Sequence, residues 1–135
     1  MDLRVFVYGT LKPGGYYWPR YAEGKVAFHQ PARVRGLLYH LRPGYPGLVE
    51  GEGWAQGILL TLKDEEALRG MDELEGYAPG RPASENEYQR RRVECWDETG
   101  RSLGEVWVYL MLPDKIRELD GVPVAGDTWN DPRPR

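Results

Sequence analysis

The feature that most constrains the fold is a short apolar strand near the N-terminus that ends in glycine. Residues 3–8 are rich in β-branched and aromatic side chains, a pattern typical of a strand buried on both faces. Gly9 ends this run and Pro13-Gly14-Gly15 gives a second turn signal, so the chain turns sharply here. A glycine loop after a strand exposes backbone N–H groups, which can bind an anion or a developing oxyanion. The alternative, a turn that binds nothing, stays open on the loop alone.

The same loop excludes a nucleotide-binding phosphate loop. Gly9 and Gly14 have the spacing of the two glycines of that motif, which then continues with lysine and Ser/Thr. Gly15 and Tyr16 stand at those two positions. The groups that would hold the phosphates and the magnesium ion are therefore missing.

The composition favours one sheet-rich domain with no general attraction to nucleic acids or anionic membranes. The chain has 135 residues, a usual size for one domain. Its 17 glycines and 11 prolines imply many turns, as in folds built from short strands. The formal net charge of −3 gives no general attraction to nucleic acid or to an anionic membrane.

Two absences in the sequence predict a cytoplasmic protein. No apolar run approaches the roughly 20 residues of a membrane span, and the N-terminus lacks the apolar core of a signal peptide. Cys95 is the only cysteine, so no internal disulfide and no zinc knuckle can form. We expect Cys95 to be an inert residue of the sheet.

Turn signals divide the rest of the chain into short strands and one clear helix. Strands are expected at residues 32–41, 48–50, 54–62, 88–96 and 104–111, the last two joined as a hairpin at Thr99-Gly100. Residues 16–21 are expected to form a short helix or turn, residues 80–87 a mobile polar loop, and residues 112–135 an irregular tail. The sequence thus predicts a single α+β domain over residues 1–135, a small bent mixed β-barrel with one main helix packed on it.

The helix predicted at residues 64–75 contains the most informative carboxylate. Each residue advances by about 100° around the axis, which gathers the apolar side chains on one stripe: Ala67, Leu68, Met71 and Leu74. Glu75 falls inside this stripe, Asp72 on its flank and Glu73 on the opposite side. A carboxylate that faces the core is costly unless it is paired or used. The alternative is a frayed helix end that leaves Glu75 in solvent.

Three short motifs occur in order along the chain: Tyr8-Gly9-Thr10-Leu11 followed by Lys12, then Asp72-Glu73-Leu74-Glu75-Gly76, then Tyr88-Gln89-Arg90. In combination they resemble the gamma-glutamylcyclotransferase-like superfamily, over about residues 5–109. Its members are small bent β-barrels, and the resemblance implies the same fold here. Aligned on the Asp-x-x-Glu pattern, the implied catalytic glutamate is Glu75 rather than Glu73, the residue that the helix geometry also selects. Tyr16, Tyr17 and Trp18 stand where many members carry an asparagine.

The resemblance implies an enzyme that cleaves a γ-glutamyl amide and releases 5-oxoproline with a free amine or amino acid. In this reaction the substrate's own α-amine attacks the γ-carbonyl, so ring closure gains its rate from proximity. Glu75 is implied as the acid/base. The implied substrate-binding residues are Tyr8, Gly9, Thr10, Leu11, Tyr88, Arg90 and Tyr109. Tyr88 and Tyr109 are alternatively ordinary half-buried strand residues.

The resemblance implies no cofactor and no metal. His29 and His40 have no cysteine or carboxylate at ligand spacing. The expected partner is a small-molecule γ-glutamyl substrate, without a role for nucleic acid or membrane. Arg90-Arg91-Arg92 fits a solvated strand with one inward arginine better than a nucleic-acid patch, because alternate strand residues face opposite sides.

Two alternative functions are kept. The first is an amide hydrolase or a γ-glutamyl transfer enzyme that uses the same site, and release of free glutamate instead of 5-oxoproline would reveal a hydrolase. The second is a non-catalytic small-molecule binding module, against which Glu75 argues because such a module needs no base. The sequence leaves open the oligomeric state and the leaving amine, which would contact residues 16–18 and 76–87.

Overall fold

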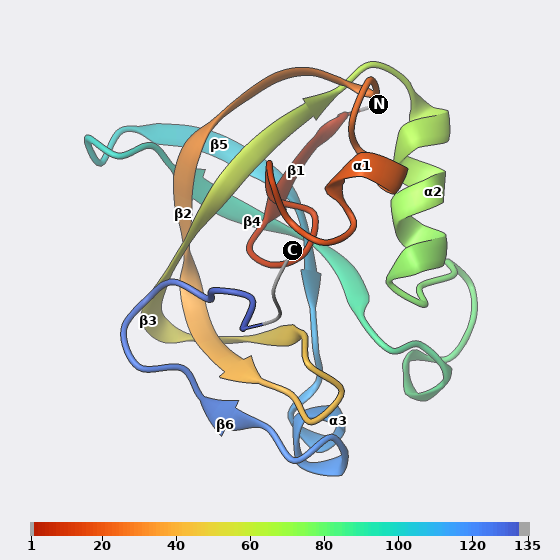
Figure 1. Ribbon diagram of the computed structural model, residues 1–135, viewed down its shortest axis with the longest axis vertical. Coiled ribbons are helices and arrows are strands. Elements are labelled where there is room, and N and C mark those ends of the chain that lie inside the picture. The colour runs from red at the N-terminus through yellow and green to blue at the C-terminus, as the bar shows by residue number, and fades with distance from the viewer. Residues whose placement is uncertain (1, 133–135) are drawn as a thin grey trace.

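Within residues 2–132, which the computed structural model describes, the chain forms a strongly bent sheet with helices on its outside (Figure 1). The elements follow the order β1 (Arg4–Val7), α1 (Trp18–Tyr21), β2 (Val26–His40), β3 (Pro46–Leu62), α2 (Glu65–Leu74), β4 (Gln89–Trp96), β5 (Ser102–Leu110), α3 (Pro113–Glu118) and β6 (Val122–Pro123). A short 3-10 turn, η1 (Ala83–Glu85), lies in the loop between α2 and β4. No helix in this part of the chain is long and apolar enough to cross a membrane.

Five of the strands close into a ring. Hydrogen bonds join them in the order β3-β1-β5-β4-β2, β2 pairs again with β3, and β6 adds to β2. The β1–β5 pair is parallel, whereas the other pairs are antiparallel, including the predicted hairpin of β4 and β5. The predicted mixed α+β fold with one main helix is therefore confirmed. The sheet closes into a ring but is not a true barrel, which corrects the predicted β-barrel.

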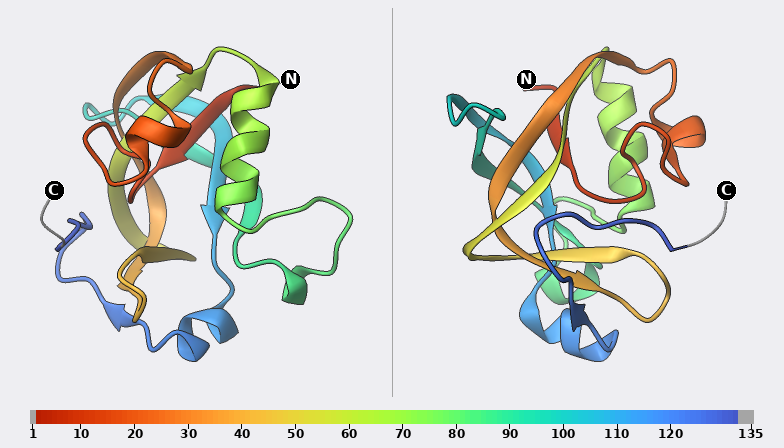
Figure 2. Two further views of the ribbon diagram at one scale, coloured as in Figure 1. Left: turned by 45° about the vertical axis from the view of Figure 1, so that its right-hand side comes forward. Right: turned by 60° about the vertical axis from the view of Figure 1, so that its left-hand side comes forward.

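β1 runs through the core between β3 and β5. Val5 and Phe6 are fully buried, as expected for a strand covered on both faces. Val5 packs in one core cluster with Leu68 and Met71 of α2, whereas Phe6 belongs to a second cluster built from the other strands. Figure 2 shows α2 standing along the side of the sheet, with α1 beside it. The predicted helix therefore covers the strand that leads into the glycine loop.

β3 is longer than the sequence predicts. Residues 48–50 and 54–62 belong to one strand, because Gly51 and Gly53 stay extended between them. These glycines pass close to Leu37 of β2, and a β-carbon on Gly53 would lie 2.8 Å from Leu37 Cδ2. They let the strand bend around Leu37 instead of ending it. β2 likewise begins at Val26 rather than at residue 32, because it pairs with β3 along its length.

The C-terminal segment is more ordered than predicted. The irregular tail expected from residue 112 onward contains α3 and β6, and β6 pairs with β2. Pro113 occupies the first turn of α3, where proline favours a helix instead of breaking it. Trp129 is buried, and its indole N–H donates to His40 Nδ1 at 3.0 Å. Residues 133–135 of the predicted tail lie outside the described residues.

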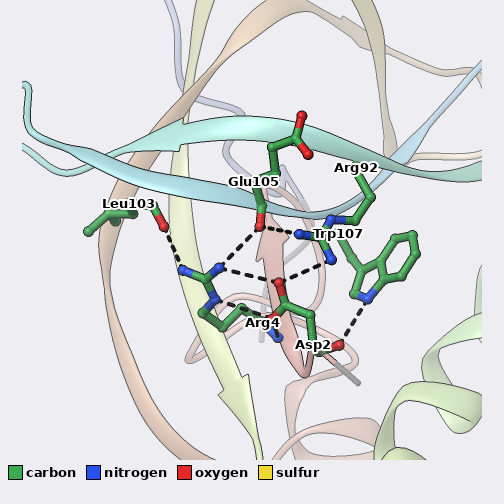
Figure 3. Close-up of polar contacts among 6 residues, drawn as sticks. All are labelled: Asp2, Arg4, Arg92, Leu103, Glu105 and Trp107. Atoms are coloured by element: carbon green, nitrogen blue, oxygen red, sulfur yellow. Dashed lines mark hydrogen bonds and ion pairs between the residues drawn. The ribbon is translucent and has the colours of Figure 1, made fainter.

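A polar cluster around Asp2 fastens the start of β1 to β4 and β5 (Figure 3). The Asp2 carboxylate accepts a hydrogen bond from Arg4 Nε at 3.2 Å and pairs with Arg92 Nη1, also at 3.2 Å. Arg4 Nη1 donates to the Leu103 carbonyl oxygen at 2.6 Å, and the Trp107 indole N–H donates to the Asp2 carbonyl oxygen at 2.9 Å. Burial raises the pKa of Asp2, but the hydrogen bonds of Arg4 and the charges of Arg4 and Arg92 bring it below its usual value.

Candidate active site

A pocket of about 650 Å³, including its open mouth, lies where the loop after β1 meets the end of α2. Seven of the eight predicted site residues line it: Tyr8, Gly9, Thr10, Leu11, Glu75, Tyr88 and Tyr109. The other lining residues are Phe6, Val7, Tyr17, Tyr45, Pro46, Leu74 and Glu87. Tyr17 and Glu87 belong to the two segments that the sequence analysis expected to contact the leaving amine. The structure thus brings the predicted residues together, whereas their roles in binding and catalysis stay predictions.

Glu75 enters the pocket from the end of α2. It is the C-cap residue, and its N–H donates to the Met71 carbonyl oxygen at 2.9 Å. Gly76 follows with φ +63°, the left-handed conformation that commonly ends a helix and that glycine adopts without strain. Glu73 is exposed whereas Glu75 is half-buried, so the two glutamates differ as the helical spacing predicts.

The electrostatic surroundings of Glu75 favour its neutral form. Burial of the carboxyl group, together with the negative charge of Glu87, raises the pKa of Glu75 to about 8. Among the described residues none donates a hydrogen bond to this carboxylate or forms an ion pair with it. The residue still borders the pocket. Glu75 is therefore able to exchange a proton with a bound molecule near neutral pH.

Four tyrosine hydroxyls around the pocket donate hydrogen bonds within the protein: those of Tyr8, Tyr45, Tyr88 and Tyr109. The hydroxyls of Tyr8 and Tyr88 donate to the carbonyl oxygens of Tyr109 and Pro46, each at 2.5 Å. Burial raises the pKa of both well above the usual value, and the charge of Glu75 adds to this effect. These tyrosines are neutral at physiological pH and contribute their rings to the pocket wall.

The backbone of the loop after β1 is available for a ligand. The loop is held by the Lys12 N–H, which donates to the Gly9 carbonyl oxygen at 3.2 Å, and by the Tyr17 N–H, which donates to the Thr10 carbonyl oxygen at 2.9 Å. No described residue accepts a hydrogen bond from the N–H groups of Gly9, Thr10 or Leu11. All three residues line the pocket, so these donors suit an anion or an oxyanion.

Gly9 has a packing role that the sequence does not reveal. A β-carbon at this position would lie 2.6 Å from Pro46 Cγ, closer than real β-carbons approach other atoms. The sequence interpretation explained Gly9 only by the turn that ends the strand and exposes backbone N–H groups. The contact with Pro46 is a second reason, and it comes from a residue distant in sequence.

Arg90 is the predicted site residue that lies outside the pocket lining. Its Nε is 3.5 Å from Asp72 Oδ1, and its guanidinium lies over the Trp107 ring at 4.4 Å from the centroid. Asp72 also accepts a hydrogen bond from the Tyr109 hydroxyl at 2.6 Å. Burial raises the pKa of Asp72, while Tyr109 and Arg90 act in the opposite direction. Arg90 therefore supports the pocket residue Tyr109 through Asp72.

Asp72 and Glu87 are the main polar residues of this region to which the sequence analysis gave no role of their own. Asp72 was expected on the flank of the helix but is buried, with 8% of its surface exposed. It lies three residues before Glu75, a spacing that places both residues on neighbouring parts of one helix face. This spacing could have predicted that Asp72 lies near the pocket. Glu87 and its partner Tyr45 come from loops without periodicity, so only the fold brings them to the pocket.

The other ligand-type side chains do not gather around the pocket. Within residues 2–132 no group of three or more His, Cys, Asp and Glu side chains is placed to hold a metal ion. Cys95 is buried in β4, and burial raises the pKa of its thiol to about 11, so it is not a reactive thiolate. Independence from metals is still a prediction about the reaction.

Comparison with known proteins identifies the family. The family model described as gamma-glutamyl cyclotransferase, AIG2-like, matches residues 5–131, whereas a comparison with curated proteins gave no match. An AIG2-like protein from Mus musculus has 22% identity and a TM-score of 0.69, with 96% of this chain and 88% of that chain covered. A protein from Arabidopsis thaliana has 24% identity and a TM-score of 0.63, with coverage of 96% and 70%. A protein named gamma-glutamyl cyclotransferase has 15% identity and a TM-score of 0.60, with coverage of 89% and 81%.

At these identities the solved structures establish the fold, and the family model carries the assignment. Its match extends over nearly the whole chain and includes the three motifs from which the resemblance was inferred. The predicted resemblance is therefore confirmed, and this protein belongs to the gamma-glutamyl cyclotransferase, AIG2-like family.

Proposed function

We propose that the protein is a γ-glutamyl cyclotransferase, which converts a small-molecule γ-glutamyl amide into 5-oxoproline and a free amine or amino acid. The observation that carries the proposal is Glu75, a carboxyl group with a pKa of about 8 that borders an open pocket. The same pocket is bordered by the free N–H groups of Gly9, Thr10 and Leu11. A base and an oxyanion-binding loop are the two parts that intramolecular amide cleavage requires.

The chemistry needs no second substrate. The neutral α-amine of the substrate attacks the γ-carbonyl carbon, a carbon–nitrogen bond forms, and the carbonyl oxygen becomes an oxyanion. Glu75 takes the proton released by the attacking nitrogen and gives a proton to the leaving nitrogen as the amide carbon–nitrogen bond breaks. Loop N–H groups hold the oxyanion, and one such donor typically contributes about 10²–10³ in rate. Because Glu75 must be deprotonated to begin, we expect activity to rise with pH up to about 8.

The decisive experiment is to incubate the protein with a panel of γ-glutamyl amino acids and γ-glutamylamines. Mass spectrometry then measures 5-oxoproline, free glutamate and any γ-glutamyl group transferred to an added amine. Release of 5-oxoproline supports the proposal. Release of free glutamate would assign an amide hydrolase, transfer would assign a transfer enzyme, and binding without any product would assign a binding module.

A further inference from the structure

A second carboxylate, Glu87, is built into the same pocket as Glu75. The two residues are 12 positions apart in sequence, but the Glu87 N–H donates to the Gly76 carbonyl oxygen at 3.0 Å. This bond places Glu87 beside the residue that follows Glu75. The approach is close, since a β-carbon on Gly76 would lie 3.1 Å from Glu87 Cβ. The left-handed turn at Gly76 thus brings both carboxylates to one pocket wall.

The side chain of Glu87 is oriented by the protein. The Tyr45 hydroxyl donates a hydrogen bond to Glu87 Oε1, and both residues line the pocket. No described residue donates to the second carboxylate oxygen or forms an ion pair with it. Asn86, the preceding residue, is buried and fixes the backbone of the loop. Glu87 is therefore a positioned acceptor with one oxygen left for a ligand.

The charge of the pocket is unbalanced. None of its lining residues is a lysine, arginine or histidine, although two of them are glutamates. Carboxylates that share a pocket of this kind repel each other and attract a cation. The free N–H groups of the loop bind negative atoms, so they do not balance this charge. Because the pKa of Glu75 is about 8, its carboxyl group is mostly neutral at neutral pH. A ligand that suits this lining therefore carries a positive group for Glu87 beside a negative or polar group for the loop.

We propose that Glu87, oriented by Tyr45, binds the α-ammonium group of the substrate and so restricts the pocket to amides with a free α-amine. This inference rests on the proposed function and assigns a different task to each carboxylate. Glu87 captures the ammonium form, and Glu75 takes one of its protons so that the neutral amine can attack. As the amide bond breaks, Glu75 gives that proton to the leaving nitrogen and then takes the remaining extra proton from the ring nitrogen. Capture by Glu87 also holds the nitrogen near the γ-carbonyl, which is the orientation that intramolecular attack requires.

The test compares two ligands that differ only at the α-carbon. γ-Glutamylmethylamide carries the α-ammonium group, and N-methylglutaramate lacks it. Their dissociation constants are measured by calorimetry in a Glu75→Gln background, which blocks turnover and leaves Glu87 as the charged carboxylate of the pocket. We expect the ammonium ligand to bind about 10- to 100-fold more tightly, as for one charge-assisted hydrogen bond. When Glu87→Gln is added to this background, the ratio of the two dissociation constants should fall to nearly one.

Two further variants still test the role of Glu87 if the double variant does not fold. Glu85→Gln removes the same charge from the exposed turn η1 of this loop and should leave the preference unchanged. Tyr45→Phe keeps the carboxylate but removes the hydroxyl that orients it, so the preference should fall about 3- to 10-fold. A preference that persists in both Glu87→Gln and Tyr45→Phe, or that is absent while Glu87 is present, overturns the inference.

The outcomes separate this inference from the proposed function. If the unaltered protein releases 5-oxoproline but the preference does not depend on Glu87, only the role of Glu87 is wrong. If no γ-glutamyl amide yields 5-oxoproline and neither ligand binds, the proposed function fails and the inference fails with it.

Discussion

Glu75 and Glu73 are close in sequence but differ in what surrounds their carboxylates. Glu75 borders the pocket, whereas Glu73 is exposed on the outer side of α2. We expect Glu75→Gln to lower 5-oxoproline release by about 10² or more, because the amide keeps the shape but accepts no proton. Glu73→Gln is the matched control and should retain activity. Loss of activity in Glu73→Gln, with a normal rate in Glu75→Gln, would show that the wrong glutamate was chosen.

The same residue links stability to pH. The pKa of Glu75 is about 8 in the folded protein against 4.5 for an ordinary glutamate, so the folded state retains a proton that the unfolded state releases. This contribution to the free energy of unfolding should be complete at a pH below the pKa of Glu75 in the unfolded state. It should be lost as the pH rises through the pKa of Glu75 in the folded state. Urea unfolding at about pH 4 and about pH 9 checks this. The wild type should lose more stability than Glu75→Gln between these conditions, and equal losses would contradict the assigned pKa.

At single positions, the sequence was most informative where chemistry and periodicity coincide. Glu75 was found because a carboxylate interrupts an apolar stripe. Gly9 was found by its place after a strand, but its contact with Pro46 required the tertiary structure. A substitution at Gly9 would therefore disturb packing as well as ligand binding, so it is a poor test of the loop.

Among the elements, the loop between α2 and β4 departs most from its expected behaviour. Residues 80–87 were expected to be mobile, but Asn86 Oδ1 accepts hydrogen bonds from the Ala78 N–H at 3.1 Å and from Arg81 Nε at 2.7 Å. Asn86→Ala should leave these donors unpaired, lower stability by about 1–3 kcal/mol and accelerate hydrogen exchange at the Glu87 amide. Ser84→Ala, at an exposed position of the same loop, should do neither. Unchanged exchange in Asn86→Ala would show that other contacts hold the loop.

The elements were predictable to different degrees for physical reasons. α2 has a strong helical period and clear end signals, and the structure gives Asp64 as its N-cap and Glu75 as its C-cap. β3 was predicted as two short strands, because Gly51 and Gly53 look like breaks in sequence but stay extended in the curved sheet. β2 was predicted too short, because its first residues form a strand through pairing with β3. Single hydrogen-bonding residues such as Asn86 produce no periodic pattern in the sequence, so the sequence did not reveal that this loop is held in place.

At the scale of the whole molecule, the C-terminal segment supports the loop that carries the site. Lys12 Nζ donates to the Trp129 carbonyl oxygen at 2.8 Å, and Trp129 is buried close to Gly9. Trp129→Ala should cost about 3–5 kcal/mol of stability, as for a large core truncation, and should also reduce activity because the loop loosens. Asn130→Ala changes an exposed neighbour and serves as the control. Thermal unfolding and 5-oxoproline release are measured on the same preparations. If Trp129→Ala changes neither, Trp129 does not support the loop after β1.

The proposed acid/base chemistry also concerns the whole protein, since it predicts that activity does not depend on a bound metal ion. Dialysis against EDTA should leave the rate of 5-oxoproline release unchanged. Loss of activity on chelation, restored by zinc or manganese, would require a different mechanism.

The position of β1 has a consequence for how the chain is made. β1 leaves the ribosome before both of its partners, β3 on one side and β5, which ends at Leu110, on the other. The ring therefore cannot close during synthesis until most of the chain has emerged. Contacts of such long sequence separation also slow folding, to about milliseconds or seconds in comparable sheet proteins. Until β5 is complete, the nascent chain exposes one apolar edge of β1, which makes this strand the segment most dependent on protection from aggregation.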